Sequence, residues 1–405
     1  MKRYLVIGSG VAGGTAAGEL ARQGHKVFIL ESTGRIGGKV LSYCCKATDS
    51  CSRCGVCVAH DRIADALRHP RVSVMTGARI EKVESGGRAT IVSGFFSNPR
   101  IAHNICTDCK ACIEACPAGS ISRYSRGGLT FTAIDYTSCL LQKGKKCSAC
   151  ADACPADAIR TAGGPKRRFT VAVDGVLIAT GHETFNPVVK ARLGYGRLPG
   201  VMTGLEAEQV LSRQDWLPAP VNGGGGDSAG VPARSVAFIQ CVGSRDPRLK
   251  RNFCSSVCCA YALRMSRMLK ARNPDMDIAV YYIDIQNFDK VFTPFRAELD
   301  RMGIRFVRGI PSAVARTGGQ RLSLLIEDPE GKRATAEHDV VVLSIGVAPP
   351  EGAAEMASLF GLELDEFGFL RSNLAGVRVA GTCGEPQGII DSIASARAAA
   401  LELVR

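Results

Sequence analysis

Cysteine is the residue type here with the most chemical potential, since the 405-residue sequence contains 18 cysteines. Two runs share Cys-x2-Cys spacing and a closing Cys-Pro pair. They are Cys106, Cys109, Cys112 and Cys116, and then Cys139, Cys147, Cys150 and Cys154. Such spacing lets a tight turn present thiolates to one small iron–sulfur cubane. Zinc sites need neither the trailing Cys-Pro nor two interlocked runs. The spacing therefore predicts two [4Fe–4S] clusters.

The last cysteine of each run is expected to bind the cluster of the other run, as in bacterial two-cluster ferredoxins. One predicted ligand set is Cys106, Cys109, Cys112 and Cys154, and the other is Cys139, Cys147, Cys150 and Cys116. We expect a ferredoxin-type domain over residues 101–164. Within it, we expect short helices at 120–122 and 158–162.

A third group of cysteines follows an apolar stretch, residues 235–240, that reads as a buried strand. Its members are Cys241, Cys254, Cys258 and Cys259. Buried free thiols behave as small apolar groups and are the plainest interpretation. Four thiols at one strand–helix corner are too many for that interpretation, so we favour a third metal cluster.

Residues 42–57 contain five more cysteines. A fourth cluster would use Cys51, Cys54, Cys57 and one of Cys44 and Cys45, of which we choose Cys45. A redox-active disulfide and a set of inert thiols are the two alternatives.

A glycine-rich turn links the first predicted strand to a helix rich in small residues. Gly8 allows the tight turn, Gly10 lets the backbone approach a pyrophosphate, and Gly13 lets helix and strand pack closely. Glu31 ends the next strand, where an acid is expected to accept the ribose hydroxyls. The pattern predicts a dinucleotide site.

Residues 235–346 repeat the alternation of strands and helices. Strands are predicted at 235–240, 277–284, 304–309 and 339–346, with helices at 259–272 and 292–303. The first turn keeps only Gly243 of the three glycines that a nucleotide turn needs. Side chains would obstruct the approach to a pyrophosphate, so nicotinamide binding is not expected here.

The net charge is +13 with a pI near 9.1, but no nucleic-acid-binding motif accompanies it. Anionic clusters and a flavin pyrophosphate would offset part of this charge. The basic stretches 164–168 and 246–251 could dock an acidic redox partner. We expect no signal peptide and no membrane span, and reduced clustered thiols indicate the cytoplasm.

Three further segments resemble two-dinucleotide-binding flavoproteins of the thioredoxin reductase type: residues 34–39, 176–182 and 376–403. The resemblance implies an α/β fold that binds FAD, with the helix after Thr382 facing the flavin; many relatives have Asp at that position. The expected FAD contacts are Gly8, Gly10, Val11, Ala12, Gly13, Glu31, Ser32, Gly38, Lys39, Ile80, Ala179, Thr180, Gly181, Gly381, Thr382 and Ile389.

The third cysteine group, with residues 139–159 and 194–211, resembles the A-subunit family of heterodisulfide reductase. The resemblance covers essentially the whole chain and implies that Cys241, Cys254, Cys258 and Cys259 bind an unusual [4Fe–4S] cluster. The expected domains are the FAD domain in three parts, the inserted bacterial-type 2[4Fe–4S] ferredoxin domain, and a degenerate nucleotide domain. In chain order they occupy 1–100 (FAD), 101–164 (ferredoxin), 165–215 (FAD), 216–348 (degenerate) and 349–405 (FAD).

The resemblance implies an oxidoreductase, a flavin and iron–sulfur electron-transfer subunit of a larger redox complex. Other subunits of that complex are the expected partners, with a ferredoxin, hydrogenase or dehydrogenase as electron donor; whether the complex bifurcates electrons is left open. The alternative is a self-sufficient NAD(P)H-dependent reductase similar to the small subunit of glutamate synthase. A zinc-stapled scaffold without enzyme activity is the third interpretation.

Overall fold

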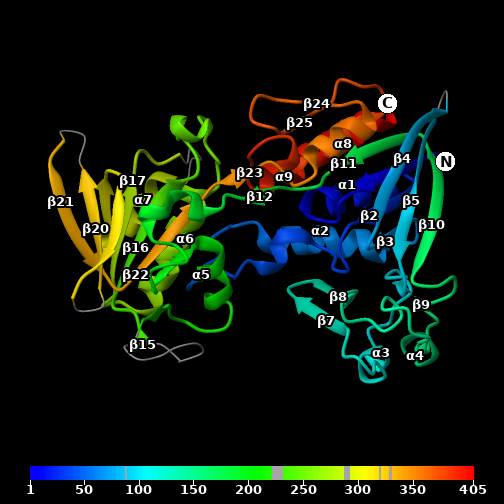
Figure 1. Ribbon diagram of the computed structural model, residues 1–405, viewed down its shortest axis with the longest axis horizontal. Coiled ribbons are helices and arrows are strands. Elements are labelled where there is room, and N and C mark those ends of the chain that lie inside the picture. Colours follow the sequence, from blue (N-terminus) through cyan, green and yellow to red (C-terminus); the bar gives the residue numbers. More distant parts are fainter. Residues whose placement is uncertain (87–88, 221–230, 287–291, 319–320, 328–330) are drawn as a thin grey trace. The chain divides into compact units, whose positions relative to one another are not determined.

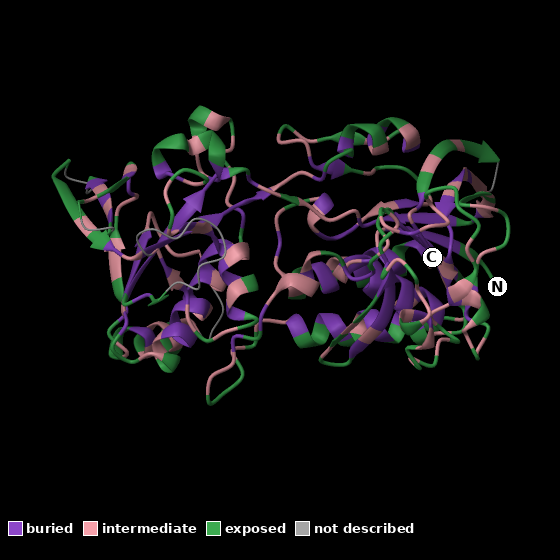
Figure 2. Cartoon of the chain, turned by 60° about the horizontal axis from the view of Figure 1, so that its bottom comes forward, coloured by how far each residue is buried: buried purple, intermediate pink, exposed green. Residues whose placement is uncertain are grey.

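The computed structural model describes residues 1–405 except 87–88, 221–230, 287–291, 319–320 and 328–330 (Figure 1). The chain forms two compact units. Unit 1 comprises Met1–Leu41, Gly55–His182 and Pro349–Arg405. Unit 2 comprises Ser42–Cys54 and Glu183–Ala348. Buried residues follow the strands of the two parallel sheets (Figure 2).

Unit 1 is built on a five-stranded parallel sheet with the order β26-β11-β1-β2-β3. Its apolar strands are covered by helix α1, which packs against α2 and α9. The strands are β1 (Arg3–Ile7), β2 (Lys26–Glu31), β3 (Val72–Thr76), β11 (Gly175–Ile178) and β26 (Val377–Val379). The helices are α1 (Val11–Arg22), α2 (Val56–Arg68), α8 (Ala353–Phe360) and α9 (Ile389–Val404).

A second, antiparallel sheet of unit 1 has the order β10-β5-β4. Its strands are β4 (Arg79–Gly86), β5 (Ala89–Ser97) and β10 (Lys166–Val173). The ferredoxin-type segment leaves the sheet after β5 and returns at β10. Unit 1 also contains the short strands β24 (Glu363–Leu364) and β25 (Leu370–Arg371).

The ferredoxin-type segment has its own small core of apolar side chains and cysteines, including Ile101, Cys112, Ile134 and Cys150. Its two short helices lie within the cysteine runs, so the helices expected at 120–122 and 158–162 are wrong. Residues 121–122 belong to a hairpin with the next strand, and residues 159–160 pair with a strand about 60 residues earlier. The elements are β6 (Arg100–Ile101), α3 (Ala111–Glu114), β7 (Ile121–Arg126), β8 (Leu129–Ile134), α4 (Ala149–Asp152) and β9 (Ile159–Arg160).

Unit 2 has a parallel sheet with the order β13-β22-β16-β17-β18 and an antiparallel sheet β19-β20-β21. Every residue of the central strand β16 is buried. The strands are β13 (Val201–Thr203), β16 (Ser235–Val242), β17 (Asp277–Tyr282), β18 (Arg305–Arg308), β19 (Ala313–Arg316), β20 (Leu322–Glu327), β21 (Arg333–His338) and β22 (Val340–Ile345). The helices are α5 (Gly204–Leu211), α6 (Cys258–Arg272) and α7 (Phe292–Arg301).

The remaining short strands of unit 2 form two pairs. They are β12 (Glu183–Thr184) with β23 (Val347–Ala348), and β14 (Pro218–Ala219) with β15 (Val231–Pro232). The predicted strands and helices of both α/β repeats are confirmed, with bounds shifted by one or two residues. Across the described part of the chain, the helices are too short or too polar to cross a membrane.

Candidate cofactor and cluster sites

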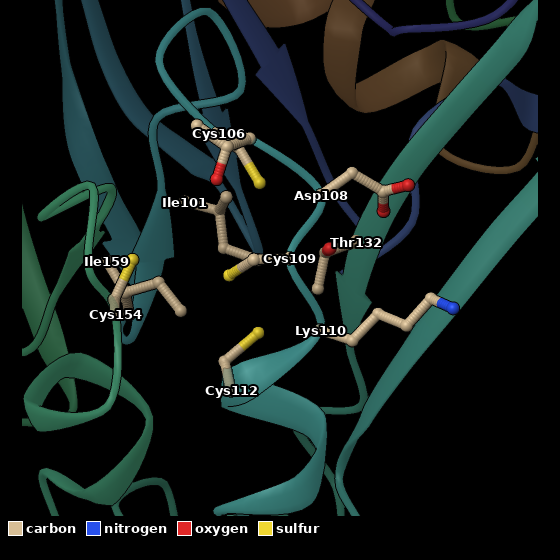
Figure 3. Close-up of a pocket in the computed structure, with 10 residues that line it drawn as sticks. Ile101, Cys106, Asp108, Cys109, Lys110, Cys112, Thr132, Cys154 and Ile159 are labelled. Atoms are coloured by element: carbon tan, nitrogen blue, oxygen red, sulfur yellow. The ribbon is translucent and has the colours of Figure 1, made fainter.

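The first ferredoxin-type site is a pocket of the inserted segment, with an empty volume of ≈ 340 Å³ that includes its open mouth. Four cysteine side chains surround it, with Ile101 and Ile159 as apolar lining (Figure 3). Asp108 and Lys110 point away from it. The four are Cys106, Cys109, Cys112 and Cys154.

The thiols of this pocket act on one another electrostatically. Burial, together with the nearby Cys106, Cys109 and Cys154, raises the pKa of Cys112 to about 11. A thiol with such a pKa holds its proton near neutral pH, and a bound metal would displace that proton. The donor set therefore fits a cluster of cationic iron.

The second ferredoxin-type site has the matching arrangement. Burial raises the pKa of Cys150 to about 12, together with the nearby Cys139, Cys147 and Cys116. Cys116 thus lies with the second run, while Cys154 lies with the first. The structure brings together both sets of four thiols in the crossed grouping; iron binding by them stays a prediction.

The crossing cysteines also receive equivalent hydrogen bonds. The backbone N–H of Ser120 donates to Cys116 Sγ at 3.3 Å, and that of Ala158 donates to Cys154 Sγ at 3.3 Å. Each donor is four residues after its cysteine. Such donors stabilise negative charge on sulfur and tune iron–sulfur potentials.

In unit 2, the third cysteine group lies where β16 ends and α6 begins. Cys241 is the second-to-last residue of β16, and its backbone has a left-handed φ of 59°. The pairing of β16 with β22 changes register between Ile239 and Val242, which marks an irregularity at this cysteine. Cys258 and Cys259 are the first two residues of α6, where the helix dipole favours thiolate charge.

The side chains of this group lie close together. A hydrogen bond with Cys241 raises the pKa of Cys258 to about 12, and a hydrogen bond with Cys258 raises that of Cys259 further. Cys254 is half-buried and accepts from the N–H of Ser256 at 3.3 Å. Arg245 pairs with Asp284, and this hydrogen bond raises the pKa of Arg245. The nearby Cys241 and Cys254 add to the increase.

Two polar side chains beside Cys241 are buried without a hydrogen bond. Gln240 is 1% exposed and Ser244 is 2% exposed. Among the described residues, neither the Gln240 amide nor the Ser244 hydroxyl has a partner. Buried polar groups are rarely left unpaired, so these atoms fit a bound polar group at the junction.

In unit 1, the turn between β1 and α1 has the geometry expected of its glycines. Gly8 has φ 101°, and a Cβ there would lie 2.3 Å from the Ala179 carbonyl oxygen. A Cβ on Gly13 would lie 1.9 Å from the Gly8 carbonyl oxygen. A Cβ on Gly10 would meet nothing nearer than the Gly37 carbonyl oxygen, 3.9 Å away. Gly8 and Gly13 therefore serve packing, whereas Gly10 faces open space that suits a pyrophosphate.

Glu31 ends β2 beside this turn and is 8% exposed. Its carboxylate accepts from the Ser9 hydroxyl at 2.6 Å and from the Thr33 N–H at 2.8 Å. Ser9 and Thr33 are contacts that the sequence interpretation missed, although the Gly-Ser-Gly turn was a visible signal for Ser9. The bonds fix the carboxylate next to the glycine turn.

Several other expected FAD residues also lie near one another. A Cβ on Gly381 would be 2.6 Å from Ala12 Cβ, and one on Gly38 would be 3.3 Å from Gly10 Cα. Ala179 lies at the Gly8 turn, as described above. Ile80 packs against an apolar core cluster of unit 1, and its expected FAD contact stays a prediction. The expected contacts of Val11, Ser32, Thr180, Gly181 and Ile389 stay predictions.

Thr382, the residue at the position where the resemblance implies Asp, has a definite partner. Its hydroxyl lies 2.9 Å from His182 Nδ1. Burial, and then the nearby Lys39 cation, lower the pKa of His182 to about 4. His182 is therefore a neutral imidazole near pH 7, and a hydrogen-bonding side chain still occupies the place of the missing Asp.

The segment 42–54 is held on unit 2 by a buried ion pair. Lys46 is 3% exposed, and its Nζ lies 2.7 Å from Glu208 Oε2 in α5. The Cys44 N–H donates to the same carboxylate at 2.9 Å. Arg267 of α6 donates to the Ser50 hydroxyl at 3.1 Å. Sequence reasoning missed this anchoring, since no motif joins positions 46 and 208.

The cysteines of this segment differ in exposure. Cys44 is buried in the apolar core of unit 2, Cys45 and Cys51 are exposed, and Cys54 is half-buried. Cys57 is exposed in the first turn of α2 in unit 1. The Arg53 N–H donates to Cys51 Sγ at 3.4 Å, much as Ser256 does to Cys254. The fourth cluster and the disulfide both stay open.

Left-handed backbone accompanies the cysteines throughout the described residues. A non-glycine residue with positive φ is uncommon and marks local strain. Every such residue lies in or just after a cysteine segment: Arg53, Asp108, Lys110, Asp157, Cys241, Arg245, Lys250 and Ser256. At two of them, Arg53 and Ser256, the backbone N–H donates to a cysteine sulfur, a geometry that Fe–S sites use.

Within the described part of the chain, no group of three or more His, Cys, Asp or Glu side chains is arranged to hold one metal ion. The four thiols of the first ferredoxin-type site lie around a larger space. A single zinc ion draws its sulfur ligands to about 2.3 Å from one point.

Two family models match parts of the sequence. A model described as an NAD(P)-binding Rossmann-like domain matches residues 6–73, and one described as a 4Fe-4S dicluster domain matches residues 105–159. They coincide with the glycine turn and with the two cysteine runs.

Solved structures share the fold. Thioredoxin reductases of T. acidophilum and Lactococcus lactis each have a TM-score of 0.52 and 14% identity. Each match covers 100% of this chain and 98% of the reductase. The chain therefore has a thioredoxin-reductase-like, two-dinucleotide-binding α/β fold with a 4Fe–4S dicluster domain in addition, as predicted.

Curated relatives are more specific. The chain is 31% identical to the A-subunit of H(2):CoB-CoM heterodisulfide,ferredoxin reductase from Methanothermobacter marburgensis, over 98% of this chain and 63% of the relative. It is 30% identical to the iron-sulfur A-subunit of CoB--CoM heterodisulfide reductase from Methanocaldococcus jannaschii, with the same coverage. The resemblance to the heterodisulfide reductase A-subunit is confirmed, and the chain spans less than two thirds of these relatives.

Proposed function

We propose that this chain is an oxidoreductase subunit that transfers electrons between FAD and [4Fe–4S] clusters in a heterodisulfide-reductase-like complex. When bound, FAD exchanges electron pairs and the clusters exchange single electrons. The observation that carries the proposal is the cysteine group at the β16–α6 junction, since the corresponding junction in unit 1 has a glycine turn. The relatives' names support a complex of several subunits.

The FAD site that we propose lies at the glycine turn of unit 1. Gly10 would let the backbone approach the pyrophosphate, and the N-terminus of α1 would stabilise its charge. Glu31, oriented by Ser9 and Thr33, would accept the ribose hydroxyls. Thr382 and the neutral His182 would offer a hydrogen bond to the flavin in place of a carboxylate.

Twelve cysteines would hold three clusters, two in the ferredoxin-type domain at 101–164 and one at the β16–α6 junction. Each group of four cysteines would supply four thiolates to one cluster, and backbone N–H donors would stabilise the charge on sulfur. A fourth cluster at Cys45, Cys51, Cys54 and Cys57 is the extension of this proposal. Cytoplasmic localisation follows from the need to keep so many thiols reduced.

The NAD(P)H-dependent reductase is the competing function. Cys258 and Cys259 occupy the helix start that would face a pyrophosphate, and 15 residues (243–257) separate β16 from α6. A nucleotide turn is far shorter, as the three residues Gly8 to Gly10 in unit 1 illustrate. This difference argues against nicotinamide binding in unit 2.

The test is anaerobic purification followed by cofactor analysis and mixing with NADPH. We expect FAD, at least about twelve iron atoms per chain for three clusters, and no prompt bleaching of the flavin. Rapid bleaching by NADPH would favour the reductase instead. Identification of co-purifying subunits from the native host would establish the partner complex. A chain that purifies alone and oxidises NADPH catalytically would contradict it.

The fourth cluster needs its own comparison. The variant Cys51→Ser/Cys54→Ser is expected to lose about four irons if these residues hold a cubane. The matched control is Cys383→Ser, a buried single thiol in unit 1. Unchanged iron together with a disulfide between residues 51 and 54 in mass spectra would support the redox-active disulfide.

A further inference from the structure

The two halves of the ferredoxin-type segment differ sharply in charge. Residues 101–138 contain three basic residues (Lys or Arg) and three acidic residues (Asp or Glu), so their net charge is zero. Residues 139–168 contain seven Lys and Arg and only two Asp. A net charge of +5 on 30 residues, within a chain of +13, marks one strongly basic region.

Two basic stretches form this region, and hydrogen bonds hold them together. Gln142 Nε2 donates to the Asn98 carbonyl at 2.7 Å and to the Pro165 carbonyl at 2.5 Å. The buried Asn98 donates in turn to the carbonyl of Gly164 at 2.9 Å. The loop that begins at Lys143 therefore lies beside the stretch that begins at Lys166.

The lysines of the loop face solvent. Lys143, Lys145 and Lys146 are exposed, as are Lys166 and Arg167. None of the three loop lysines forms an ion pair with another residue in the described part of the chain. We define these five side chains as the lysine-loop patch.

The acids of the same region are already engaged. Asp157 pairs with Arg160, and Asp152 accepts from the Ser148 hydroxyl at 2.6 Å. Burial lowers the pKa of Arg100, and the neighbouring Arg167 and Arg160 lower it further. In the described part of the chain, neither acid forms an ion pair with a side chain of the patch.

The other basic stretch, residues 246–251, is used inside unit 2. Arg251 donates to the Gly243 carbonyl at 2.6 Å and to the Val347 carbonyl at 2.5 Å. Asp246 pairs with Lys190 at 2.7 Å. Arg248 and Lys250 are the exposed cations of this stretch, against five in the lysine-loop patch, so the stretch is the poorer docking surface.

The patch adjoins the second ferredoxin-type site. Lys146 directly precedes Cys147, which is half-buried, and the loop lies between Cys139 and Cys147. Seven residues separate these two cysteines, whereas two separate Cys106 and Cys109 in the first run. The extra length is the part of the loop that bears the three lysines.

We propose that the lysine-loop patch is a docking surface for an acidic electron-transfer protein, which it holds beside Cys139, Cys147, Cys150 and Cys116. This inference rests on the proposed function, because the site must carry a cluster for docking to be productive. Exposed charges of one sign steer an oppositely charged partner, and attraction falls beyond about 10 Å at 0.1 M salt. Docking close to the site would therefore bring the two redox centres near each other.

The test uses anaerobically prepared full chain and an acidic 2[4Fe–4S] ferredoxin as probe. Affinity is measured against ionic strength for the native chain and for Lys143→Glu/Lys145→Glu/Lys146→Glu. At low salt we expect the variant to bind the ferredoxin at least about tenfold more weakly than the native chain. Above about 0.5 M salt the two affinities should become equal. Carbodiimide cross-linking, which joins amines to carboxylates, is expected to link the loop lysines to the ferredoxin.

The matched control is Lys2→Glu/Lys26→Glu/Lys82→Glu, which makes the same charge change at three other exposed lysines of unit 1. Equal weakening by both triple variants would overturn the proposal, since only net charge would then matter. Binding of anionic lipid vesicles or RNA through the loop lysines, without ferredoxin binding, would also overturn it. Iron content is measured in parallel: iron-free native chain contradicts the proposed function, whereas iron-loaded chain without lysine-dependent binding contradicts only the docking surface.

Discussion

The two units begin their parallel sheets with the same connection and use it in different ways. In unit 1, three residues join β1 to α1, and glycines bring the backbone into close contact at Gly8 and Gly13. In unit 2, residues 243–257 join β16 to α6, and cysteines occupy both ends. The same topological position therefore presents a glycine turn in unit 1 and a group of cysteines in unit 2.

The largest expected effect is loss of the cysteine junction's cluster. Cys258→Ser removes the thiol that contacts Cys241 and Cys259. We expect a loss of about four irons per chain, with FAD retained in unit 1. Iron and sulfide analysis with flavin absorbance measures both. Full iron content in this variant would mean that the junction holds no cluster, and Cys383→Ser serves as the thiol control.

The second expected effect concerns the buried ion pair that holds the segment 42–54 on unit 2. Lys46→Met leaves the Glu208 carboxylate buried without its cation. Breaking a buried pair in this way costs about 3–5 kcal/mol. Hydrogen exchange of α5 and α6 measures the loss, and Lys46→Met/Glu208→Leu should recover most of it. If the double variant is as unstable as Lys46→Met, the loss does not come from the unpaired Glu208 carboxylate.

The third expected effect separates ligand binding from folding at the glycine junction. Gly10→Ala adds a methyl group that touches nothing in the chain within 3.9 Å. We expect FAD to bind about tenfold or more weakly, because the methyl group obstructs the pyrophosphate. Calorimetry measures FAD affinity, and the thermal midpoint without FAD should be unchanged. Unaltered affinity would contradict the role assigned to Gly10.

The smallest expected effect is a pH dependence of unit 1. His182 has a folded-state pKa of about 4 against an ordinary value of 6.5, so the unfolded chain binds a proton that the folded chain does not. Stability therefore falls as the pH decreases below 6.5, by up to about 1.4 kcal/mol per unit until pH 4. His25, His60 and His103 of unit 1 also have lowered pKa values, and that of His103 is about 4 as well. His182→Gln should therefore reduce this slope without removing it, as measured by hydrogen exchange of α1 and α9 between pH 7.5 and 5.5.

The matched control for this prediction lies in unit 2. Burial also lowers the pKa of His338 to about 4. His338→Gln should leave the slope measured at α1 and α9 unchanged, because His338 belongs to the other unit. An equal flattening by both variants would mean that the slope reports global unfolding rather than unit 1.

Much of this fold is predictable because its strands and helices are long and strongly patterned. The two parallel sheets, the glycine turn and the three cysteine groups all leave local signals in the sequence. The short elements are different. Residues 121–126 pair with 129–134 across Gly127 and Gly128, a hairpin signal that the expected helix at 120–122 overlooked.

Contacts between distant positions are what the sequence does not reveal. Strand β9 exists because it pairs with β6, about 60 residues earlier, and not because of its own residues. The ion pair of Lys46 with Glu208 joins two ordinary surface-type residues whose burial only the fold determines. The exposure of the loop lysines and the engagement of Arg251 likewise follow from packing.

The left-handed residues in the cysteine segments bear on how such a chain matures. Each of the eight non-glycine positions costs roughly 1–2 kcal/mol of backbone energy that ordinary residues avoid. A newly made polypeptide awaiting its iron would carry that penalty without the bonds that offset it. The cysteine loops would therefore gain stability when iron binds, and loaded protein should resist proteolysis in these loops better than empty protein.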